Sequence, residues 1–217
     1  MLVIDTNTSC KGKATWLKGQ GVTTVGRYYG IQATYRDIID NTEAQELSKN
    51  GISIFVVFEK AGSAGEVTLT KSAGVADATA ALGQAQAVKQ PLGSAIYFAV
   101  EGLPNGYGSN DLPDLRNYFS GINATLGGKY DVGVYGDGIV CKTLQKEGIC
   151  KFTWLAAAST SFEGTCDYFG GEIPLWDLAQ VPPLDMTWSG LSVDFDVPNL
   201  RRNNGKFGEF IVPFVGA

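Results

Sequence analysis

The sequence predicts an α/β fold, a single (β/α)8 barrel of the TIM type, and three observations support this prediction. Eight apolar runs of strand-forming residues recur along the 217 residues. Their mean spacing of roughly 27 residues is the length of one strand–loop–helix–loop unit. Helical segments lie between most of the runs, and this alternation favours a parallel sheet. Eight units favour a closed barrel; six strands with two edge strands are the alternative.

Most of the expected strands end in a carboxylate. Continuous apolar runs are typical of strands buried on both faces, and an acid at the end of such a strand emerges at the mouth of a barrel. The clearest example is Ala95 to Glu101, after which the chain loosens at Gly102 and Pro104. The runs that end in an acid are 2–5, 53–59, 95–101, 132–137, 173–177 and 191–194, and two others, 22–29 and 152–156, end in polar or aromatic residues.

The expected helices have recognisable ends. Thr42 is the expected N-cap of the second helix, with Gln45 in the capping-box position. An alanine-rich helix stops before Pro91, and Pro113 lies in the first turn of the next one. We expect short or degenerate helices in the last third of the chain. The predicted helical segments are 14–18, 42–50, 75–90, 111–126 and 139–147.

The chain reads as one barrel domain, residues 1–199, followed by a tail, residues 200–217. The tail begins with a basic, polar stretch from Arg201 to Lys206, which we interpret as a solvated surface loop, and continues with an apolar stretch from Phe210 to Val215. Because eight strands already close a barrel, three roles are open for the tail. It forms the closing helical region, it adds a surface strand, or it contacts a protein partner; packing on the barrel is the expectation.

Composition excludes several classes of function. The formal charge of −5 and the pI of about 4.8 argue against a protein that binds nucleic acid through phosphates. No window reaches the roughly 18 apolar residues of a membrane span. Met1 directly precedes the first expected strand, so we expect no signal peptide in this chain.

Histidine is absent, and this removes catalytic triads, Cys–His pairs and imidazole bases. The four cysteines contain no CxxC pair, and a zinc site would need all four thiolates. They form a disulfide in one of three pairings or remain free thiols. No metal and no cofactor is expected. The four cysteines are Cys10, Cys141, Cys150 and Cys166.

What remains is carboxylate chemistry, as in glycoside hydrolysis, where one acid protonates the leaving oxygen and a second group stabilises or attacks the sugar carbon. Sugars also stack on aromatic rings, although core packing is the alternative for each aromatic residue. Asp137 precedes a helix and is expected to cap it. We expect only one of Asp194 and Asp196 to face the lumen. The candidate catalytic residues are Glu101, Asp194, Asp5 and Glu59, and the candidate substrate-binding residues are Arg27, Tyr28, Tyr97, Tyr135, Trp154 and Trp176.

Several of these segments, in this order, resemble a glycoside-hydrolase-like domain of unknown function related to the family 25 glycoside hydrolases, the muramidase lysozymes. The resemblance covers roughly residues 1–199 and implies a (β/α)8-type barrel with a glycan-facing pocket. The segments that carry it are Asp5, Arg27-Tyr28-Tyr29, Phe58-Glu59, Gly74-x-x-Asp77-Ala78-x-x-Ala81, Ile96 to Glu101, Tyr118-Phe119, Tyr130-x-Val132-Gly133-Val134-Tyr135-Gly136 and Val193-Asp194.

The resemblance implies roles for three acids. Glu101 matches the proton donor of the muramidases, and Asp5 and Asp194 match pocket acids of the first and last strands. The muramidases carry Asp-x-Glu on this strand, whereas this chain has Ala99 in place of the first acid. Either Glu59, Asp5 or Asp194 takes over the role of the missing carboxylate, or the pocket is inactive. The sequence leaves the location open, and the resemblance suggests that the protein is extracellular or exported by a non-classical route.

The leading hypothesis is therefore an enzyme that cleaves a cell-wall glycan of the peptidoglycan type or another amino-sugar polymer, with Glu101 as general acid. The second hypothesis is an inactive glycan-binding barrel that serves as a targeting or assembly module. A third is an unrelated barrel enzyme with a phosphate ligand. The glycines at positions 133, 136 and 138 suggest it, although a tight turn also explains them.

Overall fold

Eight strands form a closed barrel in the computed structural model, which describes residues 1–30, 36–60, 68–100, 109–171 and 175–213. The α/β barrel prediction is confirmed, and the open-sheet alternative is wrong. Strands β1 to β7 run parallel to their neighbours, in chain order around the barrel. The strands are β1 (Leu2–Thr6), β2 (Val22–Gly30), β3 (Ser53–Glu59), β4 (Ala95–Val100), β5 (Asp131–Gly136), β6 (Phe152–Ala156), β7 (Leu178–Trp188) and β8 (Leu191–Pro198).

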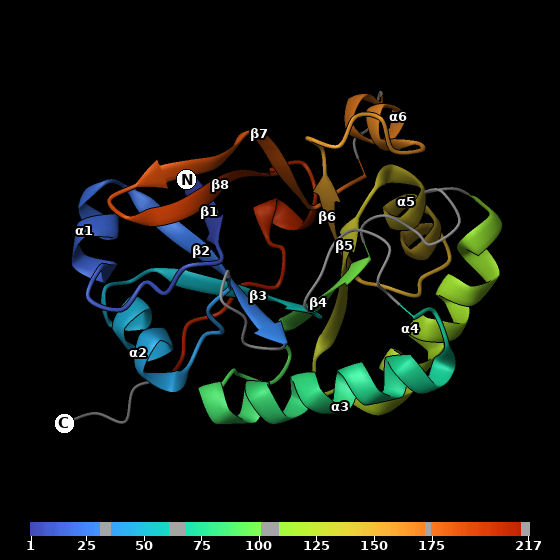
Figure 1. Cartoon of the computed structure of the whole chain (residues 1–217), viewed down its shortest axis with the longest axis horizontal. Coiled ribbons are helices and arrows are strands. Elements are labelled where there is room, and N and C mark those ends of the chain that lie inside the picture. The colour runs from blue at the N-terminus through green and yellow to red at the C-terminus, as the bar shows by residue number, and fades with distance from the viewer. Residues whose placement is uncertain (31–35, 61–67, 101–108, 172–174, 214–217) are drawn as a thin grey trace.

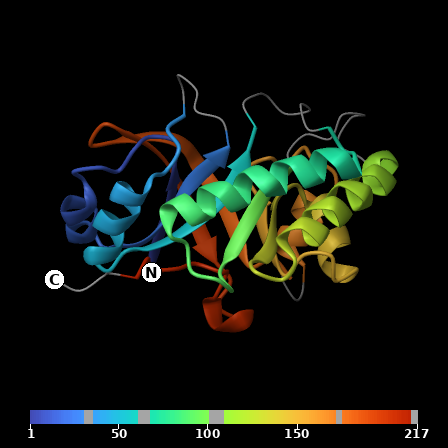
Figure 2. The same ribbon diagram turned by 90° about the horizontal axis from the view of Figure 1, so that it is seen from below.

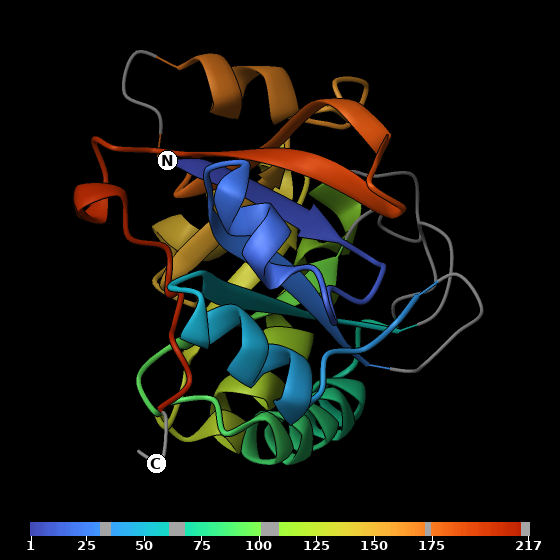
Figure 3. The same cartoon turned by 90° about the vertical axis from the view of Figure 1, so that its left-hand side faces the viewer.

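The last strand departs from the regular pattern, because β8 runs antiparallel to both β7 and β1. A two-residue turn, Ser189-Gly190, joins β7 to β8, and both residues have positive φ angles of 53° and 77°. Two positive φ values are the requirement of the type I′ hairpin turn. The two strands form a long ribbon beside β1 (Figure 3). As a result the start of β8, rather than its end, meets the carboxyl ends of the parallel strands.

The predicted seventh strand is placed wrongly. Residues 172–174 lie outside the described part of the chain, and Leu175 to Asp177 precede β7 rather than forming it. Asp177 lies at the amino end of the barrel, where its carboxylate accepts hydrogen bonds from the Thr153 N–H and the Arg202 Nε. Polar and proline residues interrupt β7, so it does not stand out as an apolar run.

Six helices and two 3₁₀ turns of the described residues surround the barrel (Figure 1). Asp40, and not the predicted Thr42, caps α2, because its carboxylate accepts from the Glu43 N–H. Thr70 caps α3, which begins four residues before its predicted start. The helices are α1 (Ala14–Gly19), α2 (Asn41–Lys49), α3 (Lys71–Val88), α4 (Leu112–Leu126), α5 (Gly138–Lys146) and α6 (Thr165–Gly170), and the turns are η1 (Ser109–Asp111) and η2 (Asn203–Gly205).

The tail closes the amino end of the barrel. Phe207 is fully buried inside it, and its carbonyl accepts a hydrogen bond from the Tyr97 hydroxyl at 2.7 Å. Phe210 exchanges two backbone hydrogen bonds with Ile54 at the start of β3. Figure 2 shows η2 and the N-terminus at this same end of the molecule. The opposite, carboxyl end of the parallel strands therefore stays available for a site.

Candidate active site

A polar cavity of about 270 Å³ opens at the carboxyl ends of the strands. This is the end at which barrel enzymes carry their active sites. Its walls come from β2, β3, β5, β7 and β8 and from the loops that follow β1, β2 and β6. The lining residues are Asn7, Tyr28, Arg36, Glu59, Tyr135, Ser159, Gln180, Leu184, Asp185 and Asp194.

Two of the predicted acids meet through a glutamine. Asp5 of β1 and Asp194 of β8 are direct register partners, because the antiparallel course of β8 brings Asp194 to the cavity. The Gln180 Nε2 donates to Asp5 Oδ2 at 2.9 Å and to Asp194 Oδ2 at 3.2 Å. The Tyr135 hydroxyl donates to Gln180 Oε1 at 2.9 Å and so fixes which end of the amide faces the acids.

Asp194 is the acid of this group that faces the cavity. It is half-buried, and its Oδ1 accepts the backbone N–H of Asp185 at 2.5 Å. Burial raises the pKa of Asp194 above its ordinary value, and the Asp185 N–H opposes that shift. The register of β7 against β8 shifts between Val181 and Met186, and this irregularity carries Asp185 to the cavity wall.

Beneath the cavity, Asp5 and Asp196 form a buried, hydrogen-bonded carboxyl pair. Asp5 is 1% exposed, and burial together with the charge of Asp194 raises its pKa to about 7. The Trp154 Nε1 donates to Asp196 Oδ1 at 2.7 Å. Burial and the nearby Asp5 raise the pKa of Asp196 well above its usual range, which favours the protonated form of this acid.

The expectation that only one of Asp194 and Asp196 faces the lumen was wrong. Residues two apart on a strand point to the same face of the sheet. Both side chains lie inside the barrel, Asp194 at the cavity and Asp196 one layer below it against Trp154.

Glu59 and Tyr28 form the opposite wall together with Arg36. The Arg36 Nη2 pairs with Glu59 Oε1, and its Nη1 donates to the Glu59 carbonyl at 2.8 Å. The guanidinium carbon lies 5.0 Å from the centre of the Tyr28 ring, within the range of a cation–π contact. The Tyr28 hydroxyl donates to Asp5 Oδ1 at 3.3 Å. This wall places one cation and one aromatic ring beside the acids.

Four other predicted binding residues do not line the cavity. Arg27 and Tyr28 are neighbours on β2 and point to opposite faces, so Arg27 lies outside the barrel, fully buried and paired with Glu43 at 2.6 Å. Tyr97 is fully buried in the barrel interior. Trp154 lies under Tyr135, with ring centres 4.4 Å apart, and Trp176 stacks on Phe169 outside the barrel. Core packing accounts for these aromatic side chains.

Glu101 lies outside the described residues, so its predicted role as general acid stays a prediction.

The glycines of β5 and α5 have a structural explanation that does not involve phosphate. A Cβ on Gly138 would lie 2.1 Å from the Gly164 carbonyl oxygen, so the close approach of the loop before α6 requires glycine. Asp137 caps α5 as predicted, accepting from the Val140 N–H at 3.0 Å.

The four cysteines are free thiols, of which Cys166 alone is exposed. Burial raises the pKa of Cys10 and of Cys150 to about 12, so neither is a reactive thiolate at neutral pH. Within the described ranges, no group of three or more His, Cys, Asp or Glu side chains is placed to hold a metal ion. None of the helices in those ranges has both the length and the apolar character to span a bilayer.

Four residues of the site were not predicted from the sequence: Arg36, Gln180, Asp185 and Asp196. Asp196 carried a usable signal, because it shares a strand face with Asp194. Gln180 and Asp185 lie on a strand whose irregular register no apolar pattern reveals. Arg36 follows a stretch of residues, 31–35, outside the described ranges.

Comparison with solved structures shows where this barrel recurs. The Tat-secreted protein Rv2525c of Mycobacterium tuberculosis, in complex with L-tartrate, superposes with a TM-score of 0.77 at 20% identity, covering 96% of this chain and 98% of that one. GHIP, a glycosyl hydrolase 25 of Streptococcus pneumoniae, superposes with a TM-score of 0.56 at 13% identity, covering 94% of this chain and 89% of that one. The autolysin LytC of the same species, in complex with a synthetic peptidoglycan ligand, superposes with a TM-score of 0.58 at 18% identity, covering 90% of this chain and 46% of that one. At these identities the likeness is one of fold.

Sequence comparison gives the family. The uncharacterized protein FadG of Bacillus subtilis is 29% identical over 160 residues, which are 72% of this chain and 28% of FadG. The chain spans about a quarter of the length of the curated relatives it matches. The model of the Rv2525c-like, glycoside hydrolase-like domain matches residues 14–184. The chain therefore belongs to the Rv2525c-like family of glycoside hydrolase-like domains.

Proposed function

We propose that this chain is a glycan hydrolase that acts on a cell-wall glycan of the peptidoglycan type or on another amino-sugar polymer. One observation carries the proposal: the Asp194 carboxylate faces a polar cavity, held by the Asp185 N–H and Gln180 and flanked by the rings of Tyr28 and Tyr135. A carboxylate beside aromatic rings suits a sugar whose ring carbon becomes positively charged during cleavage. The glycosyl hydrolase and autolysin that share the fold support the substrate class.

Asp194 is the residue proposed to stabilise the positive charge, or to orient a substrate acetamide that attacks the sugar carbon. Asp5 is buried and is not among the residues that line the cavity, so it acts through Gln180 as a positioning residue. Glu101, by resemblance to the muramidases, is the proposed general acid.

The geometry constrains the roles of Asp5 and Asp194. Their oxygens accept from the same Gln180 nitrogen at 2.9 Å and 3.2 Å, so the two oxygens cannot lie further apart than the sum of those distances. That sum is shorter than the roughly 6.5–9.5 Å between the carboxyl groups of inverting glycosidases. We infer that this pair does not act as an inverting acid and base, which agrees with Asp5 as a positioning residue and Glu101 as the proposed general acid.

The test is the release of reducing sugar from peptidoglycan and from chitin-type oligomers by Glu101→Gln and Asp194→Asn variants. A general acid contributes about 10²- to 10⁴-fold to the rate, so Glu101→Gln should lower the rate by at least about 100-fold. Asp194→Asn should also lower the rate, because it removes the negative charge that stabilises the sugar carbon or orients the acetamide. Glu147→Gln is the matched control, because Glu147 pairs with Arg116 on the exposed surface and does not line the cavity. Wild-type rates in both site variants would remove the proposed mechanism.

A glycan-binding barrel without catalysis is the second candidate, and Ala99 favours it. By the resemblance, this position of β4 carries an acid in the muramidases. Binding of the wild-type chain to insoluble peptidoglycan without release of reducing sugar would support this candidate. A Tyr135→Ala variant should then bind less, because it loses both the ring and the hydrogen bond to Gln180.

A further inference from the structure

The end of the barrel opposite the cavity carries many exposed cations. The loops that precede the parallel strands meet the tail there, and the Ala95 N–H donates to the Gly208 carbonyl and the Gly93 N–H to the Lys129 carbonyl. We call this surface the basic end. In the part of the chain that the structure describes, its exposed basic residues are Lys18, Lys49, Lys89, Lys129, Lys146, Lys151, Arg201 and Lys206.

Few acids offset these cations. Asp131 pairs with Lys151 and Glu209 pairs with Lys206, while Glu147 pairs with Arg116. The positive charge contrasts with the formal charge of −5 for the whole chain. Interactions between exposed charges fade beyond about 10 Å at 0.1 M salt, so a nearby surface responds to this local charge rather than to the total.

Helix electrostatics explain part of the pattern. Lysines in the last turn of a helix are stabilised by its dipole, and Lys18, Lys49 and Lys146 occupy such positions in α1, α2 and α5. Lys129, Lys151, Arg201 and Lys206 lie outside helices, and Lys89 is the C-cap residue of α3. Lys151 and Lys206 pair with acids, whereas Lys129 and Arg201 need another explanation.

Two exposed leucines stand among the cations. Leu92 is 71% exposed and Leu200 is 70% exposed, and after Met1 they are the most exposed large apolar side chains of the described residues. Leu92 lies three residues after Lys89, and Leu200 directly precedes Arg201. Single exposed leucines are common on protein surfaces, so it is their position among exposed cations that makes these two available to an interface.

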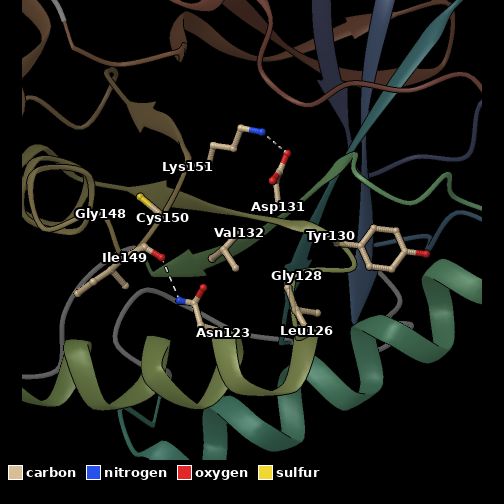
Figure 4. Close-up of a pocket in the computed structure, with 10 residues that line it drawn as sticks. All are labelled: Asn123, Leu126, Gly128, Tyr130, Asp131, Val132, Gly148, Ile149, Cys150 and Lys151. Carbon is tan, nitrogen blue, oxygen red and sulfur yellow. Dashed lines mark hydrogen bonds and ion pairs between the residues drawn. The ribbon is translucent and has the colours of Figure 1, made fainter.

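A second cavity opens at the same end (Figure 4). It has a volume of about 390 Å³ and lies between α4 and β5. Leu126 and Ile149 contribute apolar surface, and the Lys151–Asp131 pair lies beside them, with the amino group 2.7 Å from the carboxylate. This cavity adds apolar area to the basic end.

We propose that the basic end docks on a membrane surface rich in anionic lipid, with Lys89, Lys129 and Arg201 facing the headgroups and Leu92 and Leu200 entering the interface. Exposed apolar side chains with surrounding lysine and arginine are the combination that binds such surfaces. Leucines contribute to binding a bilayer but not to binding a soluble polyanion, so the observations favour lipid. Docked in this way, the chain holds its polar cavity away from the membrane.

The test is cosedimentation of the purified chain with vesicles at about 0.1 M salt. Vesicles of phosphatidylcholine are compared with vesicles in which phosphatidylglycerol replaces about a third of that lipid. Binding to the anionic vesicles should fall at least tenfold in a Lys89→Gln/Lys129→Gln/Arg201→Gln variant and in a Leu92→Ser/Leu200→Ser variant. The matched control, Lys11→Gln/Lys71→Gln/Lys142→Gln, makes the same change in net charge away from this end and should bind as the wild type does.

Three results would overturn the proposal: no preference for the anionic vesicles, equal loss in the control, or undiminished binding by the leucine variant. Binding that depends on the cations but not on the leucines, and that soluble polyphosphate abolishes, would assign the surface to a polyanion instead. All changed residues are exposed except Lys142, which is partly exposed, and thermal unfolding of each variant checks that it folds. Sugar release is measured separately, because the proposed catalytic function does not depend on docking.

Discussion

At the scale of single residues, Asp5 is a buried acid whose environment favours the neutral form. It is 1% exposed, lies near Asp194 and shares a hydrogen bond with Asp196. Burial raises its pKa to about 7, whereas an aspartate in an unfolded chain titrates near 3.9. Between these two pH values the folded chain holds a proton that the unfolded chain has lost, so folding is linked to pH through this residue.

We therefore expect Asp5 to lower the free energy of unfolding as the pH rises from about 4 to about 7, by on the order of 1 kcal/mol per pH unit, and we expect this contribution of Asp5 to level off above that range. An Asp5→Asn variant should show a smaller slope between pH 5 and 7. Urea unfolding at a series of pH values measures it. Asp167→Asn, at an exposed position of α6, is the control and should keep the wild-type slope. An unchanged slope in Asp5→Asn would contradict the assignment.

The sequence located several site residues but not their contacts. Tyr28, Tyr135, Glu59 and Asp194 were predicted and line the cavity. Arg27 was predicted beside Tyr28, but strand alternation turns it outward to Glu43. That error was avoidable, because alternation is a property of the sequence. The contacts of Gln180 with two acids were not predictable, because they depend on how β7 and β8 pair.

At the scale of elements, α3 and α4 pack through two glycines. A Cβ on Gly74 would lie 2.0 Å from the Tyr118 carbonyl oxygen, and a Cβ on Gly121 would lie 2.2 Å from the Lys71 carbonyl oxygen. Both glycines therefore allow the two helix backbones to approach closely (Figure 2). The sequence predicted both helices from composition and end signals, but the spacing between them depends on tertiary packing.

A Gly74→Ala or Gly121→Ala variant should be destabilised by about 1–3 kcal/mol, because the added methyl group forces the helices apart. Gly83→Ala in the same helix α3 is the matched control, since a Cβ there meets nothing within 4 Å. It should gain about 0.5–1 kcal/mol from the better helix propensity of alanine. Urea unfolding followed by circular dichroism distinguishes a loss from a gain in the free energy of unfolding. A stabilised Gly74→Ala variant would refute close backbone packing.

At the scale of the whole molecule, the tail is part of the barrel core. Phe207 packs on Phe55, with ring centres 5.5 Å apart, and Tyr97 donates to its carbonyl. Truncating a buried phenylalanine costs about 3–5 kcal/mol, so Phe207→Ala should lower the free energy of unfolding by that amount. Leu200→Ala, at a 70% exposed position, should change it by less than about 0.5 kcal/mol. Thermal and urea unfolding measure both, and a mild effect at Phe207 would show that the tail is dispensable.

The fold class was predictable because eight apolar runs at regular spacing are a property of the sequence alone. The direction of β8 was not predicted, although the Ser189-Gly190 pair is a hairpin signal that such an analysis can use. The role of the tail was not decided, because an apolar segment after the last strand does not reveal which surface it covers. Packing against Phe55 and Ile54 answers that question.

The aromatic side chains that fill the barrel determine from which side a long ligand can reach the cavity. Phe55 contacts the rings of Tyr97, Trp154 and Phe207, and Trp154 contacts Tyr135 at the floor of the cavity. These rings obstruct the axis, so a long polymer does not thread through from one side to the other. Under the proposed function, a glycan would lie across the rim of the cavity, and both products of its cleavage would leave through the opening at which the glycan bound.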